Sequence, residues 1–143
     1  MSIADLKLDF STSPTVWKFL KDKSFVRGLM GPVGSGKSYA CAAEIMLKAV
    51  SQVPSPKDGI KYSRFVVVRN SYPELRTTTI KTWQELFPEN VWGPFRWSPP
   101  LTHHIKLPSR DNAPGVTARL SFWPLTSQKM LGNYCPWNLL GLG

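Results

Sequence analysis

Hydrophobic positions along the chain fall into short blocks that predict alternating strands and helices. Two apolar runs of strand length, at 25–30 and 65–68, flank a segment at 39–50 whose composition is that of a helix. An apolar run without polar alternation is typical of a strand buried on both faces of a parallel sheet. The order strand, helix, strand therefore predicts a βαβ unit with a right-handed crossover. Small residues at 40–43 would let the helix pack closely on the sheet.

Capping residues mark two further helices. Ser13 followed by Pro14 has the chemistry of a helix start, with a serine N-cap and a proline in the first turn. The sequence SYPE at 71–74 matches a capping box, again with a proline in the first turn. The second helix should end before Pro88. Its apolar face is predicted to contain Ile80, Trp83 and Phe87, with Leu86 beside them.

The second half of the chain predicts a β-hairpin. Residues 115–123 (GVTARLSFW) alternate between apolar and polar, as in a half-buried antiparallel strand, and 104–107 are a candidate partner strand. The connecting sequence PSRDNAPG has turn chemistry. The segment 90–100 is rich in Trp, Pro and Gly and is predicted to be irregular.

Length and charge narrow the possible partners. The chain has 143 residues, which suits one domain, and its 18 Lys and Arg against 9 Asp and Glu give a net charge of +9. This balance favours a polyanionic partner, nucleic acid first, although a basic surface that only aids solubility has the same composition. No apolar run has the length of a membrane span, and the N-terminus does not resemble a signal peptide. No membrane contact is predicted.

Several reactive side chains have both a structural and a functional interpretation. Cys41 and Cys135 are predicted to be free thiols rather than a disulfide. His103 and His104 should point to opposite faces of a strand, which argues against a shared metal ion. Arg69, at the end of the second apolar run, would either reach a phosphate or solvate a strand end. Three tryptophans would either cover the core, which is favoured, or stack on bases: Trp92, Trp97 and Trp123.

The sequence GPVGSGKS at Gly31–Ser38 fits the pattern G-x-x-x-x-G-K-[ST], which binds nucleotide phosphates. Gly31 and Gly36 permit backbone angles that let successive N–H groups converge on a phosphate, and Gly34 adds the same freedom between them. A chance glycine-rich turn is the alternative. It is disfavoured because a predicted strand leads into the loop and a predicted helix leads out of it.

Each side chain at the end of this loop has an expected role. Lys37 would place its ammonium group against the β- and γ-phosphates and is the expected catalytic residue. The hydroxyl of Ser38 would bind Mg²⁺, and the helix that begins there would direct its positive end at the anion. The predicted nucleotide-binding residues are Gly31, Pro32, Val33, Gly34, Ser35, Gly36, Lys37, Ser38 and Tyr39.

Three segments resemble the ATPase half of the large terminase subunit, the DNA-packaging motor of tailed bacteriophages. They are FVRGLMGPVGSGKS at 25–38, RFVVVRNSYPELRTTTIKTWQELFP at 64–88 and PGVTARLSFWPL at 114–125. The resemblance implies an α/β P-loop NTPase core of the ASCE (RecA-like) type, with a parallel sheet that is incomplete here and a β-hairpin in its second half. It implies ATP and Mg²⁺ as cofactors.

The same resemblance implies a motor that couples ATP hydrolysis to translocation of double-stranded DNA into a procapsid. Its partners would be DNA, the portal protein, the small terminase subunit and further copies of itself in a ring. The protein would act in the cytoplasm of a bacterial host, encoded by a virus or a prophage. Residues 1–125 would be the N-terminal part of the ATPase domain, and no counterpart of the family's nuclease domain is expected.

The carboxylates that the family uses to bind magnesium and activate water have no counterpart among the acidic residues. None of the nine ends an apolar strand after the hairpin: Asp5, Asp9, Asp22, Glu44, Asp58, Glu74, Glu85, Glu89 and Asp111. We therefore expect weak ATP binding and no appreciable hydrolysis by this chain alone.

A frameshift near Leu125 would explain the missing acids. If residues 126–143 are back-translated and each codon is read one base earlier, permitted codons spell DQPEDVRKLLSLEFTGAW. That segment is similar to the family sequence leading into its acidic strand. The tail is thus predicted to be out-of-frame translation, with a divergent natural tail as the alternative, and the encoding DNA decides between them.

Two other functional classes remain open from the sequence. One is a non-catalytic nucleic-acid-binding module that uses the net positive charge and retains a relic P-loop. The other is a small P-loop kinase, which would need an acceptor site and a lid, and the sequence indicates neither.

Overall fold

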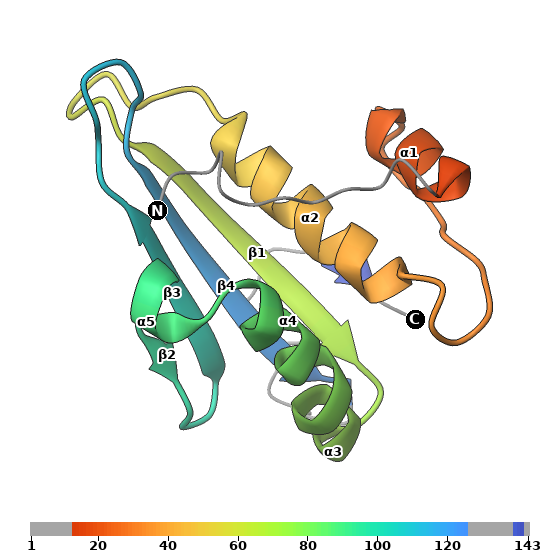
Figure 1. The fold of residues 1–143 in the computed structure, drawn as a ribbon. Helices are drawn as coiled ribbons and strands as arrows, with labels where there is room; N and C mark the ends of the chain where they lie inside the picture. The colour runs from red at the N-terminus through yellow and green to blue at the C-terminus, as the bar shows by residue number, and fades with distance from the viewer. Residues whose placement is uncertain (1–12, 126–138, 142–143) are drawn as a thin grey trace.

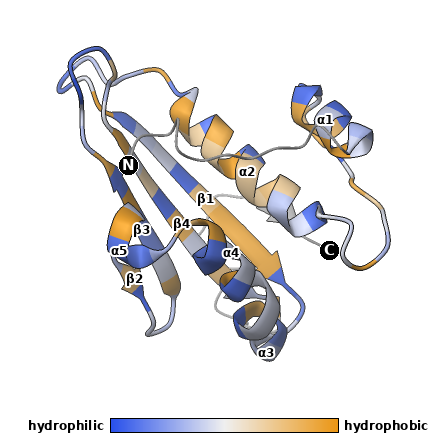
Figure 2. Ribbon diagram, viewed as in Figure 1, coloured by the Kyte–Doolittle hydropathy of each residue, from blue (hydrophilic) through white to orange (hydrophobic). Residues whose placement is uncertain are grey.

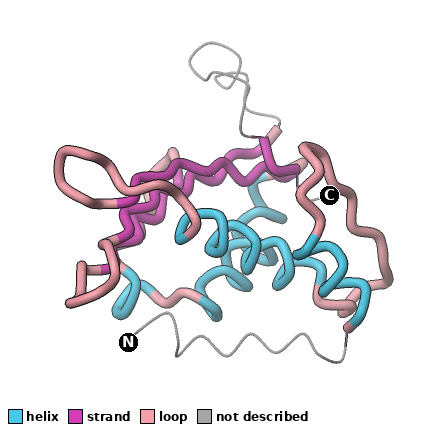
Figure 3. The backbone as a smooth tube through the Cα atoms, turned by 90° about the horizontal axis from the view of Figure 1, so that it is seen from above, coloured by secondary structure: helices cyan, strands magenta, loops and turns pink. Residues whose placement is uncertain are grey.

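The hydrophobic blocks form a mixed α/β structure in which helices cover one face of a mixed sheet. The computed structural model describes residues 13–125 and 139–141 (Figure 1). Seen along the sheet, the helices lie on one side of the strands (Figure 3). The elements in chain order are α1 Pro14–Lys21, α2 Lys37–Val50, β1 Lys61–Arg69, α3 Tyr72–Glu74, the π-helical segment η2 Leu75–Ile80, α4 Lys81–Leu86, α5 Glu89–Trp92, β2 Phe95–Arg96, β3 Leu101–Leu107, β4 Val116–Pro124 and β5 Leu139–Gly141.

The sheet has the order β2-β3-β4-β1-β5 and combines parallel and antiparallel pairs. β1 runs parallel to β4 along its whole length, from Lys61 opposite Val116 to Arg69 opposite Pro124, and it also pairs in parallel with β5. β3 and β4 pair antiparallel, which confirms the predicted hairpin. The apolar run at 65–68 lies in the second half of β1, which is longer than that run. Figure 2 shows β1 changing from hydrophilic to hydrophobic along its length.

The prediction of a strand at 25–30 is wrong. These residues form an irregular connection between α1 and α2, and the side chains of Phe25, Val26 and Met30 are 90%, 80% and 93% exposed. Within the described residues, β1 has its parallel partners in β4 and β5 instead. The glycine-rich loop is therefore entered from an irregular segment, not from a buried strand, and the predicted βαβ unit does not form.

The core lies between the sheet and the helices that cover it. On α2 three of the four small residues predicted to pack closely are buried, with Ala40 and Ala43 wholly inaccessible, whereas Cys41 is only partly buried. The inward residues of β4 are buried in alternation, as the period of two predicted. The main cluster joins α2, η2 and α4 to the inner face of the sheet through residues such as Ile45, Val67 and Phe122.

The helix after β1 begins at the predicted capping box and contains an unpredicted π-helical segment. The hydroxyl oxygen of Ser71 accepts a hydrogen bond from the backbone N–H of Glu74 at 3.4 Å, as in a capping box. Ile80, Trp83 and Phe87 are buried as predicted. At the first helix Pro14 takes its expected position, but the Ser13 side chain makes no capping hydrogen bond.

His103 is a core residue, and the metal interpretation of the two histidines finds no support. Its Nδ1 accepts a hydrogen bond of 2.8 Å from the indole N–H of Trp83, and its Nε2 lies 3.0 Å from the carbonyl oxygen of Gly93. Because Nδ1 accepts, the ring proton is at Nε2 and donates to that carbonyl. No group of three potential metal-ligating side chains occurs in residues 13–125 and 139–141. Burial lowers the pKa of His103.

Acid is expected to destabilise the fold through His103. The folded state has a pKa below the ordinary value of about 6.5, so the unfolded chain takes up the proton first as the pH falls. The free energy of unfolding should be constant above that value and should fall as the pH drops below it. Urea unfolding of the wild type and of His103→Gln, measured from pH 7.5 to 5, tests this, because the variant should show a flatter dependence.

His104 provides the matched control for this measurement. It lies on the other face of β3 with intermediate exposure, and its pKa is lowered by burial and by nearby cationic side chains. His104→Gln should therefore change the pH dependence less than His103→Gln. An unchanged slope in His103→Gln would show that the buried imidazole does not govern stability in this range.

Candidate functional site

The loop that precedes α2 is shaped by two glycines with left-handed backbone angles. Gly34 has φ of 80° and Gly36 has φ of 77°, a region that residues with a Cβ rarely adopt. Gly31, which was predicted to need such freedom, does not have a positive φ. The backbone N–H of Ser35 donates to the carbonyl of Pro32 at 3.3 Å, which closes the turn. The left-handed backbone angles that the motif needs are therefore found at Gly34 and Gly36.

Lys37 folds back over this loop. Its Nζ donates to the carbonyl oxygens of Gly31 and Pro32, both at 2.6 Å, and to the hydroxyl of Ser35 at 3.2 Å. The ammonium group is thus held at the mouth of the loop by acceptors that a phosphate oxygen can replace. α2 begins at Lys37, and the first N–H groups of a helix have no acceptor within the helix. The ammonium group of Lys37 and the positive end of the α2 dipole therefore lie together at the loop, where both would attract an anion.

A cavity of about 710 Å³ lies beside the loop. This volume is within the usual range for small-molecule sites. Residues 33–39 form one wall, and Arg69 with three threonines of η2 and α4 contributes another. The threonines are Thr78, Thr79 and Thr82. The loop, the end of β1 and η2 therefore surround one space, although they are far apart in the sequence.

The cavity is electropositive. Arg27, Lys37 and Arg69 all line it, and within the described part of the chain no aspartate or glutamate does. The charge of Arg27 is balanced by Glu44 behind the wall, so the positive charge comes from Lys37 and Arg69. Ser38, Thr79 and Thr82 also line a small adjoining space of about 10 Å³ between α2 and α4. The surroundings suit a phosphate-bearing anion, and the side-chain oxygen atoms that the described lining residues offer to a metal belong to hydroxyl groups.

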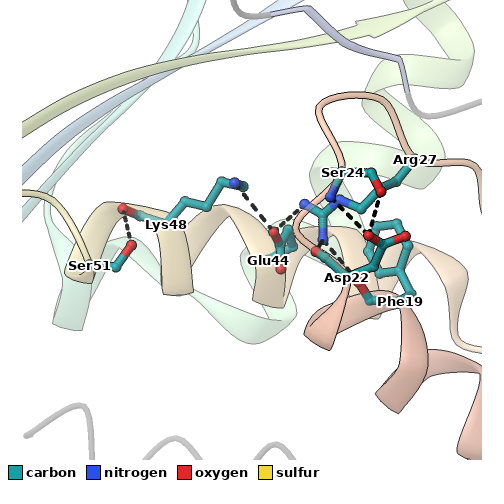
Figure 4. Close-up of polar contacts among 7 residues, drawn as sticks. All are labelled: Phe19, Asp22, Ser24, Arg27, Glu44, Lys48 and Ser51. Carbon is teal, nitrogen blue, oxygen red and sulfur yellow. Dashed lines mark hydrogen bonds and ion pairs between the residues drawn. The ribbon is translucent and has the colours of Figure 1, made fainter.

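A buried ion pair fixes the segment that leads into the loop. Arg27 bonds to the carboxylate of Glu44 on α2, and these side chains are only 8% and 7% exposed (Figure 4). The same guanidinium donates to the carbonyl oxygens of Phe19 at 2.9 Å and Asp22 at 2.7 Å, at the end of α1. One side chain therefore links α1, the irregular segment and α2.

Cys41 lines the cavity on the first half of α2 and carries a free thiol, as predicted. Burial raises its pKa to about 11, with a contribution from Glu44. The thiol is thus protonated and unreactive at neutral pH. Cys135 lies outside the described residues.

Comparison of the chain with protein-family models, curated proteins and solved structures found no match in any of the three. No helix in the described residues has the length and apolar character needed to cross a membrane.

The structure brings most of the predicted site residues to one cavity. Residues 33–39 line it, whereas Gly31 and Pro32 contribute through the carbonyl oxygens that hold Lys37. The hydroxyl of Tyr39 donates to Glu85 on α4 at 2.9 Å, which ties the loop end to that helix.

Among the lining residues that were not predicted, four carry a charged or hydroxyl-bearing side chain: Arg27, Thr78, Thr79 and Thr82. The run TTTIKT at 77–82 follows an apolar strand and its arginine, and that position at the end of a strand is the signal in the sequence that pointed to the three threonines.

Proposed function

We propose that this chain binds ATP through residues 31–39 and is the nucleotide-binding part of a viral DNA-packaging motor of the large-terminase type. The observation that carries the proposal is the loop with left-handed Gly34 and Gly36, which presents Lys37 and the start of α2 to an electropositive cavity. A triphosphate matches such a site in charge, because loop amides and a lysine together neutralise phosphate oxygens.

The motor assignment depends on the resemblance of 25–38, 64–88 and 114–125 to the terminase ATPase. The last two segments form β1, the helix after it, and β4, which lie side by side in the sheet or pack on it. The absence of a strand at 25–30 removes one expected support for a P-loop NTPase core, so the loop and the cavity are the main support. In the full motor, the partners would be double-stranded DNA, the portal protein, the small subunit and other copies.

Magnesium fits this cavity only together with the nucleotide. Ser38 offers one hydroxyl oxygen, and Mg²⁺ in nucleotide sites normally also binds a carboxylate besides phosphate oxygens and water. Among residues 13–125 and 139–141, those that line the cavity include no carboxylate. The ion would therefore be bound through the phosphates, with Ser38 as its one direct protein ligand.

The chain is expected to bind ATP without turning it over. Hydrolysis needs a group that orients or deprotonates the attacking water, and Glu44, the buried acid closest in sequence to the loop, is bonded to Arg27 instead. Equilibrium titration with a fluorescent ATP analogue should show saturable binding, and a phosphate-release assay under the same conditions should show none. Sustained multiple turnover by the purified chain would contradict this proposal.

A second candidate function is favoured by the outer face of the sheet. Arg64 and Arg119 are exposed and directly opposite each other on β1 and β4, and His104 is opposite Arg119 on β3. Like charges in this register destabilise a sheet unless an anion neutralises them. The strands β1 to β4 contain no acidic residue, so this face is suited to phosphodiester groups.

This second candidate is a nucleic-acid-binding module that does not use ATP. Duplex DNA binding that weakens steeply with salt and is unaffected by ATP would favour it over the motor. Coupling of DNA binding to ATP would favour the motor.

A further inference from the structure

Arg69 is held in a fixed orientation within the nucleotide cavity. It is the last residue of β1 and lines the cavity together with Lys37. Its Nε donates to the hydroxyl of Thr79 at 3.0 Å, and its Nη2 donates to the hydroxyl of Thr78 at 3.1 Å. Two bonds from one guanidinium to neighbouring residues restrict both its position and its plane.

The threonines that orient Arg69 are themselves fixed by the π-helical segment. The hydroxyl of Thr78 donates to the carbonyl of Glu74 at 2.6 Å, so its lone pairs are directed to accept from Arg69. Thr77 makes the same kind of bond to Pro73 at 2.8 Å. π-Helical segments are rare and often occur at functional sites. This one, η2, contributes Thr78 and Thr79 to the cavity wall.

The cavity contains more positive charge than one phosphate contact requires. Lys37 is placed for the phosphates at the loop. A second fixed cation on the wall formed by β1 and η2 would approach the phosphates from a different side than Lys37 does. A guanidinium binds phosphate oxygens in a forked arrangement, which a lysine cannot do.

We infer that Arg69, oriented by Thr78 and Thr79, binds the terminal phosphate of a bound nucleoside triphosphate and makes the site prefer ATP to ADP. The inference rests on the proposed function. Loss of one charge-assisted contact to phosphate corresponds to a roughly tenfold to hundredfold loss of affinity. That loss should fall on ATP alone, because ADP has no group at this position.

The test compares ATP and ADP affinities of the full chain by competition with a fluorescent nucleotide. The wild type should bind ATP at least about tenfold more tightly than ADP. Arg69→Gln should remove this preference and change ADP binding by less than about twofold. Arg110→Gln is the control, because it removes an exposed arginine from the turn between β3 and β4, outside the residues that line the cavity, and should leave both affinities unchanged.

A second variant covers the case in which Arg69→Gln does not fold. Thr78→Val combined with Thr79→Val keeps the guanidinium but removes both of its hydroxyl acceptors, and it should reduce the ATP preference while leaving ADP binding nearly unchanged. An ATP-to-ADP ratio that stays at the wild-type value in the folded variants would overturn the inference. If the wild type binds neither nucleotide, the proposed function itself fails, which is a different result.

Discussion

Lys37→Ala is expected to reduce ATP affinity by roughly a hundredfold, the largest effect of any single substitution on binding. The ammonium group makes three contacts to the loop in this structure, and it would exchange them for phosphate oxygens. Its removal takes away a cation at the start of α2 and leaves the phosphates with the backbone amides of the loop and the other polar side chains of the cavity. Isothermal titration with ATP and Mg²⁺ measures the effect.

The stability of the Lys37→Ala variant should stay close to that of the wild type. The Lys37 side chain is not in the core and its partners are exposed loop groups, so its loss leaves no buried polar atom without a partner. Lys57→Ala, an exposed lysine in the loop before β1, is the control for a simple loss of charge. Equal ATP affinity for the wild type and Lys37→Ala would contradict the assignment of the loop.

Glu44→Ala is expected to destabilise the fold by about 3–5 kcal/mol, the largest effect on stability. Removing the carboxylate leaves the guanidinium of Arg27 buried at 8% exposure without its anionic partner. The free energy of unfolding of a small domain is only about 5–15 kcal/mol, so this loss would lower the folded fraction substantially. Urea unfolding measures the loss. Ordering of α1 and of residues 22–30 should fail first, because Arg27 connects these segments to α2.

Two variants separate the buried pair from its surroundings. Lys48 lies 3.8 Å from the same carboxylate but is 50% exposed, so Lys48→Ala should cost well under about 1 kcal/mol. Combining Arg27→Met with Glu44→Leu replaces both charges by apolar groups and should recover most of the stability lost in Glu44→Ala. A double variant as unstable as Glu44→Ala would show that packing, not the unpaired charge, is responsible.

The sequence was a good guide to elements whose signal is local. The hairpin of β3 and β4, the helix from Lys37 and the capping box at Ser71 all depend on alternation, small residues or capping chemistry within a few positions. The π-helical segment was not predictable in this way, because its pattern of apolar residues resembles that of an α-helix.

The failure at 25–30 has a specific cause. An apolar run indicates a buried strand only if its polar member can face away from the core, and here the polar member is Arg27. Its guanidinium turns inward to Glu44, 17 positions along the chain, while Phe25 and Met30 are exposed. Such a long-range ion pair leaves no periodic signal in the sequence.

Only the wall of the cavity formed by the glycine-rich loop was predictable from the sequence. Residues 33–39 are contiguous and follow a recognisable motif, whereas Thr78 and Thr79 reach the cavity because β1 ends beside the loop. That juxtaposition depends on the parallel pairing of β1 and β4, which the sequence did not indicate. The predicted tail at 126–143 lies outside the described residues except for Leu139–Gly141, and the frameshift stays a prediction.

The most direct test of the central claim is an amide NMR titration of the isotope-labelled chain with ATP and Mg²⁺. If the loop binds phosphate, the largest shift changes should occur at the backbone amides of Gly34, Gly36, Lys37 and Ser38, with saturation. Changes confined to the outer face of the sheet around Arg64 and Arg119, or no saturable change, would contradict nucleotide binding at this loop.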